Sequence, residues 1–300
     1  MKIITQLLQQ LINGLVIGMI YSLIALGYSM VFGILGFINY AHGEIFMLGS
    51  FIGWMLLRFA GLNFVVAMVG AMLITALLGV AIDYVAYKPI REKAGRGFLD
   101  AMLVSAIGVS IFVQTLGQLL WGTETHPVGL TIFQTVFRVG PFYVSELQIV
   151  IAVVAIGCMI GLALFTTKSP LGLAIRATSQ DPVAARLMGI NVNRTIALTF
   201  AIGSALAAAS GLLVGVYFDA VYPLMGNSAG IKAFTAAVLG GIGSMPGAML
   251  GGILIGVVET LGAAYISSAF RDGFAFLVLI LTLLFMPSGL IKVTKGGGKV

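Results

Sequence analysis

The chain has 300 residues, of which 60% are hydrophobic and 9% are charged, and its mean hydropathy is +1.11. A soluble domain carries about 25% charged residues, so most of this chain's surface cannot face water. The formal net charge of +6 does not indicate a nucleic-acid partner, because the basic residues follow membrane topology instead. The composition therefore excludes a soluble domain and predicts a membrane protein.

The membrane spans are predicted from apolar runs close to the ~20 residues that a helix needs to cross a bilayer. The segment 227–242 is short and rich in glycine, which is typical of a broken or partly re-entrant helix. We expect an all-α fold, a polytopic transmembrane helical bundle of eight or nine spans that forms a single domain over residues 1–300. In chain order the expected spans lie near 11–35, 43–60, 63–87, 99–121, 147–167, 195–217, 227–242, 247–268 and 273–291.

The basic residues predict which ends of these spans face the cytoplasm. Eleven of the 16 Lys and Arg lie in three clusters, at 88–96, 168–194 and 292–299. Basic segments stay cytoplasmic, so loops 88–98 and 168–194 and the C-terminus are expected in the cytoplasm. Three spans before Lys88 then place the N-terminus outside. The connection 122–146 has no basic excess and is expected to be an outer loop.

The polar, basic segment 168–194 lies between two long apolar runs and contains a short predicted helix at 181–189. Asp181 is suited to cap the helix, Pro182 to its first position, and Gly189 to the position after its last turn. A compact helix on the cytoplasmic face is suited to dock onto a partner. The residues that we expect to form the docking element are Arg176, Asp181, Pro182, Ala184, Ala185, Arg186 and Gly189.

The segment 36–44 places Asn39, His42 and Glu44 between two apolar runs. Ionisable residues at membrane depth are costly and usually face a protein interior or a water-filled cavity. One interpretation is an unwound turn that lines a translocation path. The other is an ordinary interfacial loop, in which Glu44 favours the N-terminus of the next helix. His42 and Glu44 are too few ligands for a metal site, and none is assigned.

Other polar residues within the spans have simpler expected roles. Asp83 should pair with the basic cluster that follows it, and Arg58 and Lys232 should extend toward an interface. Glu259 has no local partner and is expected in a buried polar contact. Glycines four residues apart predict close helix packing, with real interface roles for about half of the pairs Gly14/Gly18, Gly49/Gly53, Gly157/Gly161, Gly247/Gly251 and Gly252/Gly256.

No catalytic residues are expected in this chain. The glycine-rich stretch 239–252 lacks the lysine of a phosphate-binding loop and reads as a tight turn at Ser244–Pro246 between two closely packed helices. The sequence contains no HExxH motif, and the single Cys158 excludes an internal disulfide. The absence of a nucleotide motif predicts a protein that is not an enzyme and holds no cofactor of its own.

The residues around Ala184, Ala185 and Gly189 resemble the EAA loop of ABC-importer permeases, a short cytoplasmic helix seated in a groove on the ATPase subunit. The loop's pattern is EAA, three residues, then Gly, and here Val183 stands at the Glu position. The wider resemblance, to LivH-type permeases of branched-chain amino acid importers, covers nearly the whole chain. It rests on the segments INYAHGEIFMLGSF, PLGLAIRATSQDPVAARLMGINVNR and KAFTAAVLGGIGSMPGAMLGGILIGVVE.

This resemblance implies an importer in the bacterial inner membrane that carries leucine, isoleucine, valine and other amino acids. It also implies several partners, namely membrane lipid, a second and different permease subunit, a periplasmic amino-acid-binding protein and two ATPase subunits that bind ATP and Mg²⁺. Loop 168–194 would couple the chain to those ATPases. The alternative is an ion-coupled secondary transporter of small apolar solutes, which would use intramembrane carboxylates such as Glu44 and Glu259.

Overall fold

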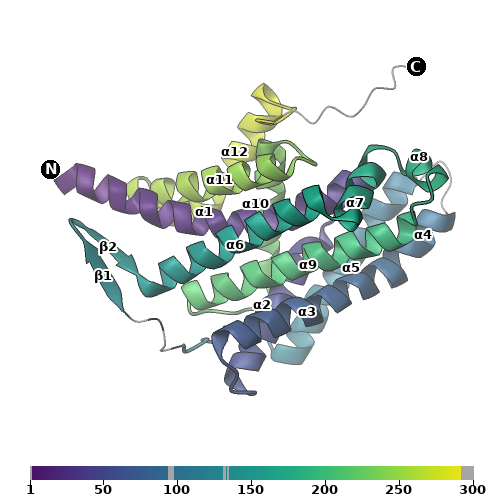
Figure 1. Ribbon diagram of the computed structural model, residues 1–300. Coiled ribbons are helices and arrows are strands. Elements are labelled where there is room, and N and C mark those ends of the chain that lie inside the picture. The colour runs from purple at the N-terminus through teal and green to yellow at the C-terminus, as the bar shows by residue number, and fades with distance from the viewer. Residues whose placement is uncertain (1, 94–97, 131–132, 134, 292–300) are drawn as a thin grey trace.

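The computed structural model describes residues 2–93, 98–130, 133 and 135–291, and they form a helical bundle with one β-hairpin (Figure 1). The elements in chain order are α1 (Lys2–Leu35), α2 (Ala41–Arg58), α3 (Phe64–Ile82), a π-helical turn (Asp83–Tyr87), α4 (Lys88–Lys93), α5 (Phe98–Trp121), β1 (Val136–Val139), β2 (Phe142–Ser145), α6 (Glu146–Lys168), α7 (Pro170–Gln180), α8 (Pro182–Leu187), α9 (Val192–Tyr217), α10 (Met225–Gly240), α11 (Met245–Tyr265), a 3₁₀ turn (Ser268–Phe270) and α12 (Arg271–Phe285).

Each of the nine predicted spans corresponds to a helix, which confirms the polytopic all-α class. Among the described residues, seven helices are long and apolar enough to cross a membrane by length and composition. The expected count of eight or nine is therefore slightly high by this criterion. Two of the predicted spans do not meet this criterion. They are α2, which carries His42, Glu44 and Arg58, and α10, which has only 16 residues. Both are largely buried among other helices, so they do not need a lipid-facing apolar surface.

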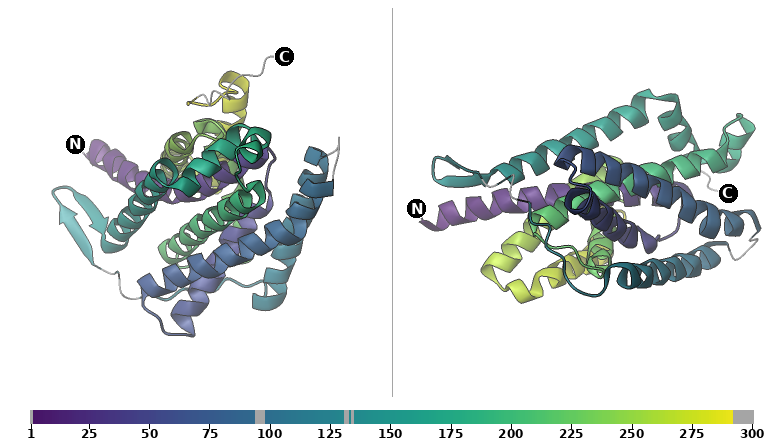
Figure 2. Two further views of the ribbon diagram at one scale, coloured as in Figure 1. Left: turned by 45° about the vertical axis from the view of Figure 1, so that its right-hand side comes forward. Right: turned by 90° about the horizontal axis from the view of Figure 1, so that it is seen from below.

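The two ends of the bundle differ in structure. The start of α1 and the β-hairpin lie at one end, and α4 and α8 lie at the other (Figure 1 and the right-hand view of Figure 2). The hairpin forms part of the loop expected at 122–146, with Val136 paired to Ser145 and Val139 to Phe142. Gln9 of α1 holds it, donating to the Tyr143 carbonyl at 2.8 Å and accepting from the Tyr143 N–H at 2.9 Å. The segments that contain two of the basic clusters thus share an end, opposite the start of α1. The third cluster, at 292–299, lies outside the described residues.

Helices α1 and α11 pack backbone against backbone through glycines. A Cβ atom at Gly18 would meet the backbone of Ile253, and one at Gly252 would meet the backbone of Ser22. Close approach of this kind drives helix association in lipid, because packing and hydrogen bonds replace the hydrophobic effect there. The Ser22 hydroxyl accordingly donates to the Met249 carbonyl at 2.6 Å. Four of the five predicted glycine pairs lie at interfaces between helices. The exception is Gly157/Gly161, where an added Cβ atom would meet no described atom within 4 Å.

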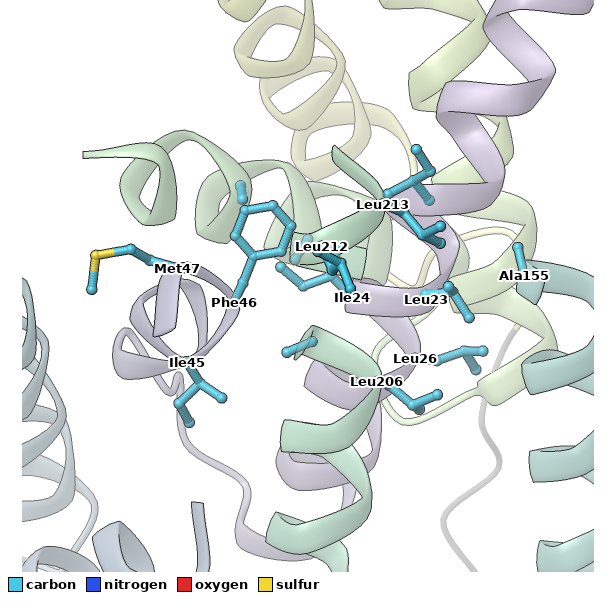
Figure 3. Close-up of a cluster of buried hydrophobic side chains, with 14 of the residues drawn as sticks. Leu23, Ile24, Leu26, Ile45, Phe46, Met47, Ala155, Leu206, Leu212 and Leu213 are labelled. Carbon is cyan, nitrogen blue, oxygen red and sulfur yellow. The ribbon is translucent and has the colours of Figure 1, made fainter. Parts of the chain in front are cut away.

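The apolar core lies between α1, α2 and α9. Figure 3 shows part of it, with Leu23 and Ile24 of α1, Phe46 of α2 and Leu212 of α9. The peripheral helices instead expose large apolar side chains, such as Leu119 of α5, as expected of surfaces that face lipid.

The short connection from α10 to α11 has the predicted tight turn, in which Ser244 caps α11.

The α1–α11 contact gives a direct test. Gly252→Ala places a methyl group against the Ser22 backbone, so the helices must separate, and overpacking of this kind costs about 1–3 kcal/mol. We expect a lower melting temperature of the purified protein. Gly157→Ala is the matched control, because its Cβ meets no described atom within 4 Å and should leave the melting temperature unchanged. Equal losses in the two variants would contradict the packing.

Candidate functional site

Helices α7 and α8 together form most of the basic segment 168–194, and both begin in the same way. The Ser169 hydroxyl accepts from the Gly172 N–H at 2.9 Å and so caps α7. The Asp181 carboxylate accepts from the N–H groups of Val183 and Ala184 at 2.8 and 2.9 Å and caps α8. A proline follows each cap, at the first helical position, where its missing N–H costs nothing. The sequence analysis missed α7, although Ser169 before a proline is the signal that it used for α8.

Helix α8 ends at Leu187, and Gly189 follows its last turn, as predicted. Gly189 has a φ of +85°, in the left-handed region that favours glycine. Its N–H donates to the Arg186 carbonyl at 3.0 Å, and the Ile190 N–H donates to the Ala185 carbonyl at 3.0 Å. These two bonds satisfy carbonyls that a helix end would otherwise leave free. A helix of only six residues is thus closed at both ends by local hydrogen bonds.

Helix α8 presents an apolar surface to the outside of the bundle. Val183, Leu187 and Met188 have exposed fractions of 69%, 83% and 83%. Ala185 faces the other way and is buried with Val192 and Ile196 of α9, so it attaches α8 to that helix. The other predicted docking residues, Arg176, Asp181, Pro182, Ala184, Arg186 and Gly189, are all exposed. We call Val183, Leu187 and Met188 the apolar patch; contiguous exposed apolar side chains of this kind mark interaction surfaces.

Helix α4, from the other described basic segment, borders α8. Arg91 pairs with Asp83 at 2.9 Å between Nη1 and Oδ1, which confirms the partner expected for Asp83. Asn193, near the start of α9, donates to the Glu92 carboxylate at 3.0 Å. A groove of about 250 Å³ between these elements is lined by Arg91, Phe98, Pro182, Val183 and Arg186, among others. The surface beside α8 therefore includes side chains of α4, α5 and α9, and a hydrogen bond joins α4 to α9.

The residues Asn39, His42 and Glu44 are all buried, at 1–2% exposure. The side-chain oxygen Oδ1 of Asn39 accepts from the Tyr87 hydroxyl at 2.8 Å, and one ring nitrogen of His42 lies 3.2 Å from the Ile24 carbonyl. Glu44 lies in the first turn of α2 and accepts from the Ser110 hydroxyl at 3.5 Å. These three side chains therefore lie inside the bundle, whereas Tyr40 of the same segment is exposed.

A cavity of about 130 Å³ brings Asn39 and Glu44 together, and Tyr28 and Ser110 also line it. Tyr28 Oη, Asn39 Nδ2 and Glu44 Oε2 are buried and have no hydrogen-bond partner among the described residues. Buried polar atoms are normally paired with protein or water, and the volume suits about four water molecules. His42 is not among the lining residues. We call this space the central cavity.

The central cavity lies where α2 and α10 touch. A Cβ atom at Gly43 of α2 would meet the backbone of Gly226 and Gly230 of α10. At this contact the two helix backbones therefore meet directly, with glycine on both sides.

The position of Lys232 differs from the expectation that its side chain extends toward an interface. Lys232 is 7% exposed, and its Nζ lies 3.1 Å from Glu259 Oε1 and 2.8 Å from Asp272 Oδ1. The buried Glu259 carboxylate holds the ammonium group inside the protein. Glu259 itself has the buried polar contact that was expected, and the partners lie within this chain.

The fold and these sites define a polytopic helical membrane protein with polar interior cavities and a capped helical projection at one end, which is the architecture of a transport permease. The chain belongs to the family described as "Branched-chain amino acid transport system / permease component", whose family model matches residues 10–283.

Individual relatives agree with this assignment. The chain is 46% identical to the high-affinity branched-chain amino acid transport system permease protein BraD of Pseudomonas aeruginosa, over 95% of each chain. It is 42% identical to the corresponding permease protein LivH of Escherichia coli, again over 95% of each chain. A solved chain of PsaBC from Streptococcus pneumoniae, in complex with Fab, shares the fold, with a TM-score of 0.51 and 12% identity over 92% of this chain and 91% of that one.

The cap of α8 can be tested locally. Asp181→Ala removes the acceptor of two N–H groups, and loss of such a cap costs about 1 kcal/mol. We expect amide hydrogen exchange of residues 183–187 to accelerate roughly fivefold. Asp181→Asn keeps a capping oxygen and is expected to exchange at close to the original rate. Identical exchange in Asp181→Ala and the unmodified protein would show that the cap does not hold α8.

Proposed function

We propose that this chain is a permease subunit of an ATP-driven importer that moves leucine, isoleucine, valine and other amino acids across the bacterial inner membrane. The observation that carries the proposal is the 46% identity, over 95% of both chains, to a branched-chain amino acid permease subunit. The exposed apolar patch on α8 supports it, because a subunit without a nucleotide motif needs a partner that supplies the energy.

The proposed partners are a second, different permease subunit, two ATPase subunits and a periplasmic amino-acid-binding protein. ATP and Mg²⁺ bind to the ATPases, and this chain carries no cofactor. The end of the bundle with α4 and α8 faces the cytoplasm, in agreement with its basic residues, and the end with the β-hairpin faces the periplasm. The C-terminus is proposed on the cytoplasmic side.

In this mechanism the ATPases close on ATP and move α7 and α8 as one unit. Ala185 is buried against α9, so the movement reaches α9 directly. Helix α9 in turn packs against α1, α2 and α3. The contact between α2 and α10 at Gly43 and Gly226 then shifts and opens the central cavity to one side of the membrane. The last step uses a contact between helix backbones, which tolerates small displacements.

The docking role of α8 predicts a specific defect. Leu187→Asp places a charge on the apolar patch without disturbing the core, since Leu187 is 83% exposed. Burying an unpaired charge in an interface costs more than 1.4 kcal/mol, so we expect at least roughly tenfold weaker ATPase binding and slower leucine uptake with normal membrane insertion. Leu187→Met keeps the surface apolar and serves as the control.

Uptake in vesicles and copurification of the ATPases measure this effect. Full uptake and full ATPase recovery with Leu187→Asp would rule out the docking role. Leucine uptake by this chain alone, driven by an ion gradient in liposomes, would instead support a secondary transporter.

The proposed orientation is tested by cysteine labelling. Gln180→Cys and Glu124→Cys are placed separately in a Cys158→Ser background, at exposed positions on the α8 side and the hairpin side. A membrane-impermeant maleimide should label Gln180→Cys only from the cytoplasm and Glu124→Cys only from outside. The reverse pattern would invert the topology.

A further inference from the structure

A second, larger cavity of about 300 Å³ lies at the end of the bundle away from α8. Helix α9 begins beside α8 and ends at this cavity, which also takes in the start of α10, the end of α11 and the start of α12. One wall is mostly apolar, with Phe46, Phe218 and Met225. The other wall carries Lys232, Glu259, Arg271 and Asp272. We call this space the charged cavity.

The floor of the charged cavity is a buried carboxylate whose two oxygens differ in their hydrogen bonds. Glu259 is 0% exposed, and its Oε1 accepts from Tyr21 Oη, Lys232 Nζ and Arg271 Nε at 3.0, 3.1 and 2.5 Å. Its Oε2 has no hydrogen-bond partner among the described residues. A buried carboxylate oxygen in a membrane protein is costly when unpaired, so this atom indicates a missing donor.

The rim of the charged cavity, in contrast, has hydrogen-bond donors without an acceptor among the described residues. Arg271 is partly exposed and uses Nε for Glu259, while its guanidinium carbon lies 5.0 Å from the centre of the Phe218 ring. Within the described chain, its two Nη groups have no hydrogen-bond partner, so they are available to an anionic group. Lys232, in contrast, donates to Tyr21, Glu259 and Asp272 and has no spare donor.

The charge balance indicates what kind of ligand fits. Lys232 and Arg271 balance Glu259 and Asp272, so the four side chains together are neutral. A lone anion or cation would leave a net charge in a medium of low dielectric constant, which is costly. A ligand with one ammonium and one carboxylate group adds no net charge and pairs with both open positions.

We propose that the charged cavity binds the zwitterion of a free α-amino acid. The ammonium group donates to Glu259 Oε2, the carboxylate accepts from the Nη groups of Arg271, and an aliphatic side chain packs on Phe46 and Met225. Arginine suits a carboxylate because its planar fork can donate two parallel hydrogen bonds. A volume of about 300 Å³ is at the small end of ligand sites, as a small metabolite requires.

This site rests on the proposed function and deepens it. It gives the importer an entry site on the side where the binding protein delivers its cargo. It also makes the permease itself selective for groups that all amino acids share, while the apolar wall favours branched aliphatic side chains. The headgroup of phosphatidylethanolamine offers the same pair of charges, so the test includes a lipid comparison.

The experiment measures protection of a cysteine in the charged cavity. Ala220→Cys, in a Cys158→Ser background, lines the cavity with no side-chain hydrogen bond to lose. The complete transporter is reconstituted without the binding protein, in vesicles with and without phosphatidylethanolamine, and maleimide labelling is followed. With L-leucine at about twice its Kd, we expect labelling to slow about threefold in both lipids. 4-Methylpentanoate, which lacks the ammonium group, and 3-methylbutylamine, which lacks the carboxylate, should give no protection at the same concentration.

Variants separate binding from structural support. Glu259→Gln keeps the size of the side chain, and Arg271→Gln changes a residue at the rim; both should abolish leucine protection. Asp83→Asn, which alters another buried ion pair at the α8 end, should retain it. Loss of protection in Asp83→Asn as well, or retained protection in Arg271→Gln, would overturn the site.

The remaining outcomes also decide the question. Labelling that is slow only with phosphatidylethanolamine and insensitive to leucine would assign the cavity to lipid and overturn the proposal. No protection by leucine, with normal ATP-dependent uptake through the binding protein, would overturn this site and leave the proposed function intact. Uptake that is independent of the ATPases would overturn the proposed function, whereas leucine protection would still report on the site.

Discussion

The direct contact between the backbones of α1 and α11 is the constraint on which the rest of the bundle depends. Gly18 and Gly252 let the two helices approach until their backbone atoms are in direct contact. Tyr21, one turn from Gly18, can reach Glu259 only because of this approach. The same contact that stabilises the centre of the protein therefore also positions a buried polar network. In lipid such a contact replaces the hydrophobic effect, which does not act between helices already surrounded by apolar chains.

Helix α10 connects the two polar cavities. Its first residues pack on α2 at Gly43, and its last residues pack on α11 at Gly247. Asn227 lines the central cavity, and Lys232, little more than a turn later, lines the charged cavity. One helix therefore contributes side chains to both cavities.

The region around α8 follows a different physical rule from the interior. Its stability comes from local hydrogen bonds, with Asp181 at one end and Gly189 at the other, and from the single buried contact of Ala185. Such a helix keeps its shape while its outer side chains remain free for a partner. The structure adds Leu187 and Met188 as its most exposed apolar side chains. Neither is among the docking residues predicted from the sequence, which were Arg176, Asp181, Pro182, Ala184, Ala185, Arg186 and Gly189.

The sequence alone determined the membrane class, the approximate positions of nine helices and the ends of α8, because hydropathy and helix caps depend on residues close together in the chain. It also indicated most of the glycine contacts, since their spacing is a local property. Tertiary structure alone decided the partners of Glu259, which lie 12, 27 and 238 positions away in Arg271, Lys232 and Tyr21. It also decided that Asn39 and Glu44 share a cavity that His42 does not line. Pairing between distant helices depends on their relative rotation and depth, and no periodicity within one helix specifies either.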